Sequence, residues 1–131
     1  MAYDCKTVGV VGTRERDTQE DFDVVWNEWK KWYDPGDSIC SGLCKKGGDR
    51  FAVIIADRLG LPKDKIIWHK AIWRRNGKYI PYAGFERNTD IAKDSDVLIA
   101  CVRPDRNGGT EDTIRKWIKF HPDTLEKLII V

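Results

Sequence analysis

The chain's most informative stretch is a run of seven residues, Asp96-Val97-Leu98-Ile99-Ala100-Cys101-Val102, which decides the fold. Every residue after the aspartate is apolar, as in a strand of a parallel sheet that is covered on both faces. A loop then leads into a segment with helical spacing from Gly109 to about Phe120. A buried strand followed by a helix is the repeating unit of α/β proteins.

The same alternation of strands and helices continues along the rest of the chain. Shorter strands are predicted at Val8–Val11, Ser38–Cys40, Lys65–His69 and Lys127–Val131. Helices are predicted from Asp17 or Thr18 to about Tyr33, from Gly47–Asp49 to Leu59, and from Gly84 to Lys93. We therefore predict one Rossmann-like three-layer domain over residues 1–131. Its sheet is mostly parallel, with about five strands and helices on both faces.

Composition excludes several classes of protein. The chain carries 23 Lys and Arg against 21 Asp and Glu, a net charge of +2, which argues against a nucleic-acid partner. No apolar run reaches the roughly 18 residues that cross a bilayer, so we expect no membrane association. The first six residues, Met1 to Lys6, lack the apolar stretch of a secretory signal, and we expect a cytoplasmic protein.

The four cysteines are Cys5, Cys40, Cys44 and Cys101, and their spacing does not suit a metal site. We interpret them as reduced thiols, with Cys40 and Cys101 in the core because they lie at the ends of predicted strands. No motif calls for a cofactor, and we expect no metal and no cofactor.

Glycine, hydroxyl and charged residues follow four of the predicted strands, at the edge where ligands bind in open α/β sheets. Each such loop precedes a helix, whose first N–H groups attract anions. The candidate ligand-binding residues are Gly12, Thr13, Arg14, Ser41, Gly42, Asp49, Gly84, Arg87, Asn88, Gly108, Gly109 and Thr110. Trp73 joins them because it lies in a long loop, residues 70–83, at the expected edge of the site.

Each of these residues also has a purely structural interpretation. Glycine at a strand–helix turn is often present only because the backbone there adopts a conformation that other residues disfavour. Asp49 and Asp112 suit the first turn of a helix, where a carboxylate stabilises the dipole. Trp73 would equally serve to anchor its own loop. The P-loop motif, the Gly-x-Gly-x-x-Gly fingerprint and the Gly-x-Ser-x-Gly elbow are all absent, which argues against P-loop NTPases, ordinary NAD-dependent dehydrogenases and α/β-hydrolases.

Taken in order, the loop segments resemble those of the SLOG superfamily of Rossmann-like nucleotide-binding domains, over roughly residues 8–118. The segments are Val10-Val11-Gly12-Thr13-Arg14, Cys40-Ser41-Gly42 with Gly48-Asp49-Arg50-Phe51-Ala52, Ala83-Gly84-Phe85-Glu86-Arg87-Asn88, and Gly108-Gly109-Thr110-Glu111-Asp112. The chain is most similar to small members of the superfamily. The superfamily also contains the Lonely-guy phosphoribohydrolases and the DNA-processing DprA proteins.

The resemblance implies a nucleotide or nucleotide-derived ligand, with phosphate held by the glycine-rich loop before the last helix. In Lonely-guy enzymes an arginine and a glutamate serve hydrolysis of the N-glycosidic bond. Arg87 matches the arginine, whereas Thr113 stands at the position of the glutamate. Ligand binding is therefore our leading hypothesis. The alternative is a nucleotide N-glycosidase in which Arg87, Glu111 and Asp112 are catalytic, with Asp49 as a further candidate.

The first predicted helix carries an unusually large apolar face. Phe22, Trp26, Trp29, Trp32 and Tyr33 cover one side of it, and aromatic residues of this kind bury about 150–250 Å² each. That area exceeds what a small sheet obviously covers, and Lonely-guy proteins resemble dimers built on helices. We expect a homodimer with the first or last helix in its interface. A monomer whose tryptophans all lie in the core is the alternative.

Overall fold

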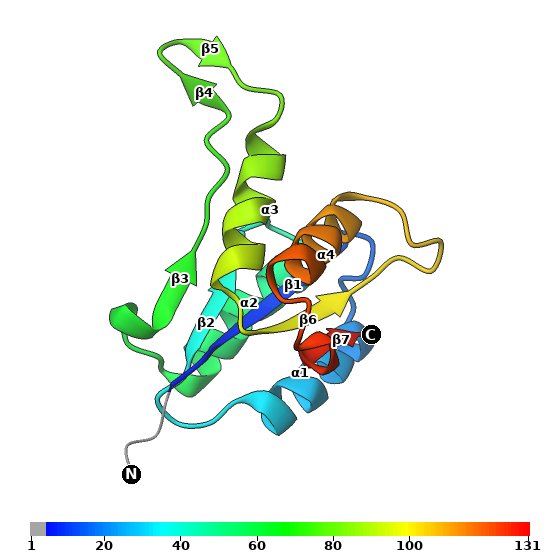
Figure 1. Cartoon of the computed structure of the whole chain (residues 1–131). Coiled ribbons are helices and arrows are strands. Elements are labelled where there is room, and N and C mark those ends of the chain that lie inside the picture. The colour runs from blue at the N-terminus through cyan, green and yellow to red at the C-terminus, as the bar shows by residue number, and fades with distance from the viewer. Residues whose placement is uncertain (1–4) are drawn as a thin grey trace.

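A computed structural model describes residues 5–131, and Figure 1 shows its arrangement. Residues 1–4, most of the stretch in which we expect no secretory signal, lie outside the described part. Five strands form one parallel sheet in the order β3-β2-β1-β6-β7. They are β1 (Thr7–Gly12), β2 (Ser38–Ser41), β3 (Ile66–Trp68), β6 (Val97–Cys101) and β7 (Leu128–Ile130). The predicted α/β class with a five-stranded parallel sheet is confirmed.

Four helices cover the sheet, two on each face. They are α1 (Gln19–Trp32), α2 (Gly48–Leu59), α3 (Ala83–Asp94) and α4 (Gly109–Phe120). Helices α1 and α2 pack on one face, and α3 and α4 pack against each other on the opposite face. Short 3₁₀ turns at Lys63–Lys65 and Leu125–Lys127 lead into β3 and β7. The three layers of a Rossmann-like sandwich are therefore present.

Strand β6 lies in the middle of both cores, as its uninterrupted apolar sequence predicts. Val97, Ile99 and Cys101 contact the core under α1 and α2. Leu98 and Ala100 contact the core under α3 and α4. All five residues of β6 are fully buried. Successive side chains of a strand point to opposite faces, so an apolar residue is needed at every position.

Helix ends follow the sequence signals closely. Thr18 caps α1, because its hydroxyl accepts a hydrogen bond from the Asp21 N–H over 3.1 Å, and the Asp21 carboxylate in turn accepts one from the Thr18 N–H. Gly60 ends α2 in the left-handed conformation, with φ 61°. That conformation is the usual glycine stop.

The tryptophans of α1 divide between the core and its margin. Trp29 is fully buried and stacks on Tyr33 with ring centroids 4.9 Å apart. Trp26 and Trp32 are half-buried and pack against the edge of the same core. Most of the large apolar face of α1 is thus used within the chain.

Residues 70–83, which we expect to be a loop, contain a small hairpin. Strands β4 (Arg74–Arg75) and β5 (Lys78–Tyr79) pair antiparallel around Asn76 and Gly77, both with positive φ. Two such residues form the tight turn that suits hairpin twist. We call residues 70–82 the arm, since they project from the body of the molecule beyond the start of α3 (Figure 1).

An ion pair links the arm to α3, and two further contacts lie within the arm itself. An ion pair joins Arg75 to Glu86, and the Ile80 N–H donates to the Trp73 carbonyl over 2.6 Å. The rings of Trp73 and Tyr79 stack within 11° of parallel.

Among residues 5–131, no helix combines the length and the apolarity needed to cross a membrane.

Candidate functional site

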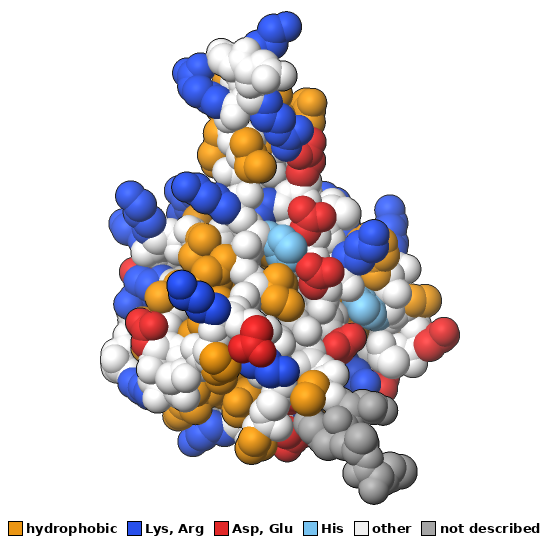
Figure 2. Space-filling view, turned by 90° about the vertical axis from the view of Figure 1, so that its left-hand side faces the viewer, with side chains coloured by type: hydrophobic (Ala, Val, Ile, Leu, Met, Phe, Trp, Pro, Cys, Tyr) orange, Lys and Arg blue, Asp and Glu red, His pale blue; other side chains and the backbone are white. Residues whose placement is uncertain are grey.

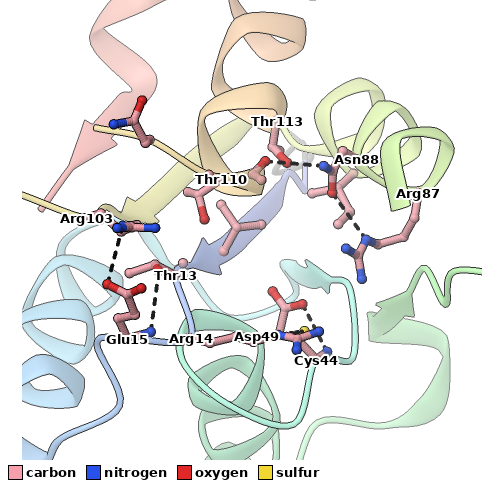
Figure 3. A pocket seen from close by; sticks show the side chains of 16 residues that line it. Thr13, Arg14, Glu15, Cys44, Asp49, Arg87, Asn88, Arg103, Thr110 and Thr113 are labelled. Atoms are coloured by element: carbon pink, nitrogen blue, oxygen red, sulfur yellow. Dashed lines mark hydrogen bonds and ion pairs between the residues drawn. The ribbon is translucent and has the colours of Figure 1, made fainter. Parts of the chain in front are cut away.

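A cavity of about 360 Å³ opens at the carboxyl ends of β1 and β6, between the first turns of α2 and α4 and the middle of α3. Figure 3 shows its side chains converging from these separate elements. Nine of the residues predicted from the sequence line it: Gly12, Thr13, Arg14, Asp49, Arg87, Asn88, Gly108, Gly109 and Thr110. The parallel topology explains their meeting, because it brings the ends of all strands to one edge.

The first turn of α4 forms one wall of this cavity. Gly108 adopts φ 111°, and no side chain caps the helix. A Cβ atom placed on Gly109 would meet nothing within 4 Å, so open space faces the backbone there. Unsatisfied N–H groups at a helix start attract anions through their hydrogen bonds and the helix dipole. This wall is the best place in the cavity for a phosphate.

Arg103 lies at the same end and was not among our candidates. It follows β6, and its side chain lies 3.3 Å from the carboxylate of Glu15 and 3.0 Å from that of Asp105. Its Nε atom is buried without an aligned hydrogen bond. Glu15 and Arg103 face each other across the cavity rim in Figure 3. Arg103 stands two residues after the end of β6, and this position at a strand end is the sequence signal that could have identified it as a site residue.

Asp49 supplies a buried carboxylate on the opposite wall, at the start of α2. It accepts hydrogen bonds from the Ser41 hydroxyl and from the Cys44 N–H, each over 3.0 Å. Burial raises the pKa of Asp49, and the Cys44 N–H and the nearby Arg87 guanidinium oppose that rise. The cavity is therefore polar in two senses, with N–H donors on one wall and a carboxylate acceptor on the other.

Arg87 and Asn88 on α3 connect the two walls. Arg87 donates to the Gly42 carbonyl over 3.1 Å and to the Asn88 side-chain oxygen over 3.2 Å. The Asn88 amide nitrogen donates to the Gly109 carbonyl over 3.3 Å. These bonds hold the first turn of α4 and the β2–α2 loop at a fixed separation.

Close backbone packing explains the glycines on the α2 side. A Cβ atom on Gly48 would lie 2.2 Å from the carbonyl carbon of Val11, and one on Gly12 would lie 3.0 Å from the Gly48 Cα. Helix α2 therefore begins directly against the end of β1. No side chain fits between them.

A second cavity of about 650 Å³ adjoins the first on the side of the arm. The two share four lining residues: Arg14, Glu15, Cys44 and Arg87. The second cavity adds Gly42 and Trp73 from our candidates. It also adds Lys45, Lys46 and Lys70, which we did not predict. Arg14 lies between the cavities with its Nε 3.2 Å from the Cys44 sulfur.

Four candidate residues lie outside the walls of both cavities. Ser41 is buried behind Asp49. Gly84 lies beside the ring of Trp73, whose nearest atom would be 3.3 Å from a Cβ placed on this glycine. Glu111 pairs with Arg106 over 2.8 Å, and Asp112 pairs with Lys116 over 2.8 Å. The two acidic residues of α4 are thus engaged in ion pairs beside the site, whereas Asp49 lines it.

Within residues 5–131, no three His, Cys, Asp or Glu side chains gather closely enough to hold a metal ion. Comparisons with protein-family models, curated proteins and solved structures give no significant match for this chain.

Proposed function

We propose that this protein binds a nucleotide or a nucleotide-derived small molecule in the first cavity. One observation carries the proposal: glycine-bearing loops from β1 and β6 and the polar residues Arg87 and Asn88 of α3 meet in one cavity, with the uncapped start of α4 as a wall. A volume of about 360 Å³ falls in the range of small-ligand sites. On the basis of the same arrangement, we also propose that the chain is related to SLOG domains.

The two unlike walls of the cavity give the ligand an orientation. Its phosphate lies at Gly108–Thr110, where the uncapped N–H groups and the positive end of the dipole of α4 face the cavity. Asp49 would repel a phosphate but accepts hydrogen bonds well, so it faces the ribose hydroxyls or a base amino group. Arg87 lies between them, within reach of either end.

The test of binding is titration calorimetry or thermal unfolding with the four common nucleoside monophosphates, beside inorganic phosphate and adenosine. A nucleotide at 100 times its dissociation constant adds about 2.7 kcal/mol to the free energy of unfolding. Thr110→Ala and Arg87→Ala should weaken binding, and Lys93→Ala, an exposed residue on α3, should not. If no nucleotide binds, or if both site variants bind as the wild type does, the proposal is wrong.

A second candidate function is hydrolysis of the N-glycosidic bond of a nucleotide. The buried carboxylate of Asp49, beside Arg87 in the cavity, favours it. Water would attack C1′ of the ribose as the bond to the base breaks, with Asp49 taking the water proton and Arg87 stabilising phosphate or leaving-group charge. Glu111 and Asp112 are weaker candidates because ion pairs hold them outside the cavity.

Chromatography of reactions with nucleoside monophosphates tests hydrolysis. Release of free base and ribose 5-phosphate that is lost in Asp49→Asn but retained in Glu111→Gln would support this role. Absence of base release from all common monophosphates excludes it and leaves the binding proposal unaffected.

We also propose that the protein forms a homodimer through α1 or α4. Val24 on α1 and Ile118 and Phe120 on α4 are each about 40% exposed, which leaves apolar surface on both helices. Sedimentation at micromolar concentration should give twice the chain mass, and Ile118→Lys with Phe120→Lys tests the α4 face. A chain mass that persists as concentration rises contradicts the dimer.

A further inference from the structure

The second cavity differs from the rest of the surface in its charge. Lys45, Lys46 and Lys70 line it, and none of them forms an ion pair with a carboxylate among residues 5–131. Glu15 is the one acidic residue among its lining residues, and its carboxylate is 3.3 Å from Arg103. In a chain with a net charge of only +2, this cavity gathers three lysines, of which Lys46 lies near enough to the Asp17 carboxylate, which does not line the cavity, to help lower the pKa of that carboxyl.

The arm adds an aromatic wall to that charge. Trp73 lines the cavity, is 44% exposed, and is held in place by its stack on Tyr79 and by the Ile80 N–H, which donates to its carbonyl. Figure 2 shows hydrophobic side chains beside Lys and Arg side chains along the arm and at its base. A fixed aromatic ring next to several lysines is suited to stack a nucleobase while the lysines bind its phosphate.

The two cavities are joined through shared residues. Arg14, Cys44 and Arg87 line both, so a ligand that leaves the first cavity on the arm side enters the second directly. The first cavity, at about 360 Å³, suits one nucleotide, and the second, at about 650 Å³, has room for another.

We propose that the ligand is a dinucleotide, with one nucleotide in the first cavity and the other in the second, its base on Trp73 and its phosphate at Lys45, Lys46 and Lys70. This inference rests on the proposed function, since it extends the same site. The phosphate of the second nucleotide is part of the linkage between the two halves, and Arg14 and Arg87, which line both cavities, contact this linkage from the side of the first cavity. The linkage is either a phosphodiester or a diphosphate, and both carry the negative charge that these residues recognise.

The experiment compares four probes by titration calorimetry on the whole chain. They are AMP, ATP, the 5′-phosphorylated linear dinucleotide pApA, and diadenosine diphosphate. At least one dinucleotide should bind about tenfold or more tightly than AMP, because it adds base stacking and phosphate contacts. Which of the two dinucleotides binds more tightly identifies the linkage. ATP should gain less than the dinucleotide, because it brings no second base to Trp73.

Variants of the second cavity separate it from the first. Lys45→Ala with Lys46→Ala, and separately Trp73→Leu, should each weaken dinucleotide binding about tenfold and AMP binding less than twofold. Lys30→Ala with Lys119→Ala removes the same charge from exposed sites on α1 and α4 and should leave both affinities unchanged. Circular dichroism of each variant checks that the fold is intact.

Each result decides one question. Equal affinity for AMP and both dinucleotides overturns this inference and leaves nucleotide binding standing. An ATP affinity that matches the dinucleotide, with no effect of Trp73→Leu, means that the second cavity takes phosphates alone, and the inference is wrong. Failure of every probe to bind overturns the proposed function as well.

Discussion

The hydroxyl of Ser41 donates to the carboxylate of Asp49 over 3.0 Å, and both side chains are buried at the wall of the first cavity. A serine at the end of β2 thus orients an acidic group at the start of α2. The same carboxylate accepts the Cys44 N–H, which fixes the loop between the two elements. The acceptor that would face a ligand is therefore held in place before any ligand arrives.

Asp49 should make the protein less stable as pH rises. Burial raises its pKa in the folded chain above the usual 3.8, so at pH values between 3.8 and that raised pKa the folded state holds a proton that the unfolded state has released. Stability from this group is complete below pH 3.8 and declines as pH rises through the folded-state pKa.

The comparison of wild type with Asp49→Asn isolates this effect from that of other carboxyls. Urea unfolding from pH 4 to pH 8 should show the difference between the two proteins shifting in favour of the variant as pH rises. A difference that stays constant, or shifts towards the wild type, would contradict a raised pKa for Asp49.

Substitution by alanine should lower stability strongly at the first residue of α2 and hardly at all at the first residue of α4. Gly48→Ala places a Cβ 2.2 Å from the backbone of Val11, and we expect a loss of about 3 kcal/mol or more in the free energy of unfolding. Gly109→Ala meets no atom within 4 Å and should leave stability within about 0.5 kcal/mol of the wild type. Denaturant unfolding measures both, and equal effects would mean that α2 does not begin against β1.

The cap of α1 should contribute measurably to stability. Thr18→Ala removes the acceptor for the Asp21 N–H, and we expect a loss of about 1 kcal/mol. Thr124→Ala serves as its control, because Thr124 precedes a 3₁₀ turn without capping it. Calorimetric melting compares the two. A Thr124 variant that loses as much as the Thr18 variant would show that the capping bond is not the cause.

The four cysteines should divide into two reactive and two protected thiols. Burial raises the pKa of Cys40 to about 12 and that of Cys101 to about 11, so both stay protonated and shielded at pH 8. Cys5 is exposed and Cys44 lines both cavities, so both should react with iodoacetamide. Peptide mass spectrometry identifies the modified residues.

A bound nucleotide should slow alkylation of Cys44 and leave Cys5 unaffected, which makes Cys5 an internal control. Modification of Cys40 or Cys101 in the folded chain at the rate of Cys5 would contradict the packing described here. Alkylation in guanidinium chloride should reach all four thiols.

Much of the fold followed from local patterns. The unbroken apolar run of β6 and the Gly60 helix stop are decided by short-range physics, and the sequence predicts them directly. Nine cavity residues were also predictable, because a parallel sheet brings every strand end to one edge.

What the sequence did not reveal depends on tertiary packing. Two-residue strands such as β4 and β5 carry almost no periodic signal, although Asn76-Gly77 marks their turn. Lys45 and Lys70 are 25 positions apart and meet only because the arm rises beside the β2–α2 loop. Glu111 forms an ion pair with Arg106 and does not line the cavity, whereas Asp49 does. No helical pattern in the sequence indicates that ion pair.

The arm is attached to α3 by few contacts, and this lowers the affinity of any ligand that stacks on Trp73. A two-stranded hairpin is marginally stable alone, and this one depends on a few contacts with α3. Whenever it detaches, the second cavity loses its aromatic wall, and the observed affinity falls in proportion to the time spent detached. Breaking the Arg75–Glu86 pair would thus tune how selectively the protein holds long ligands over short ones, without altering a single residue that touches them.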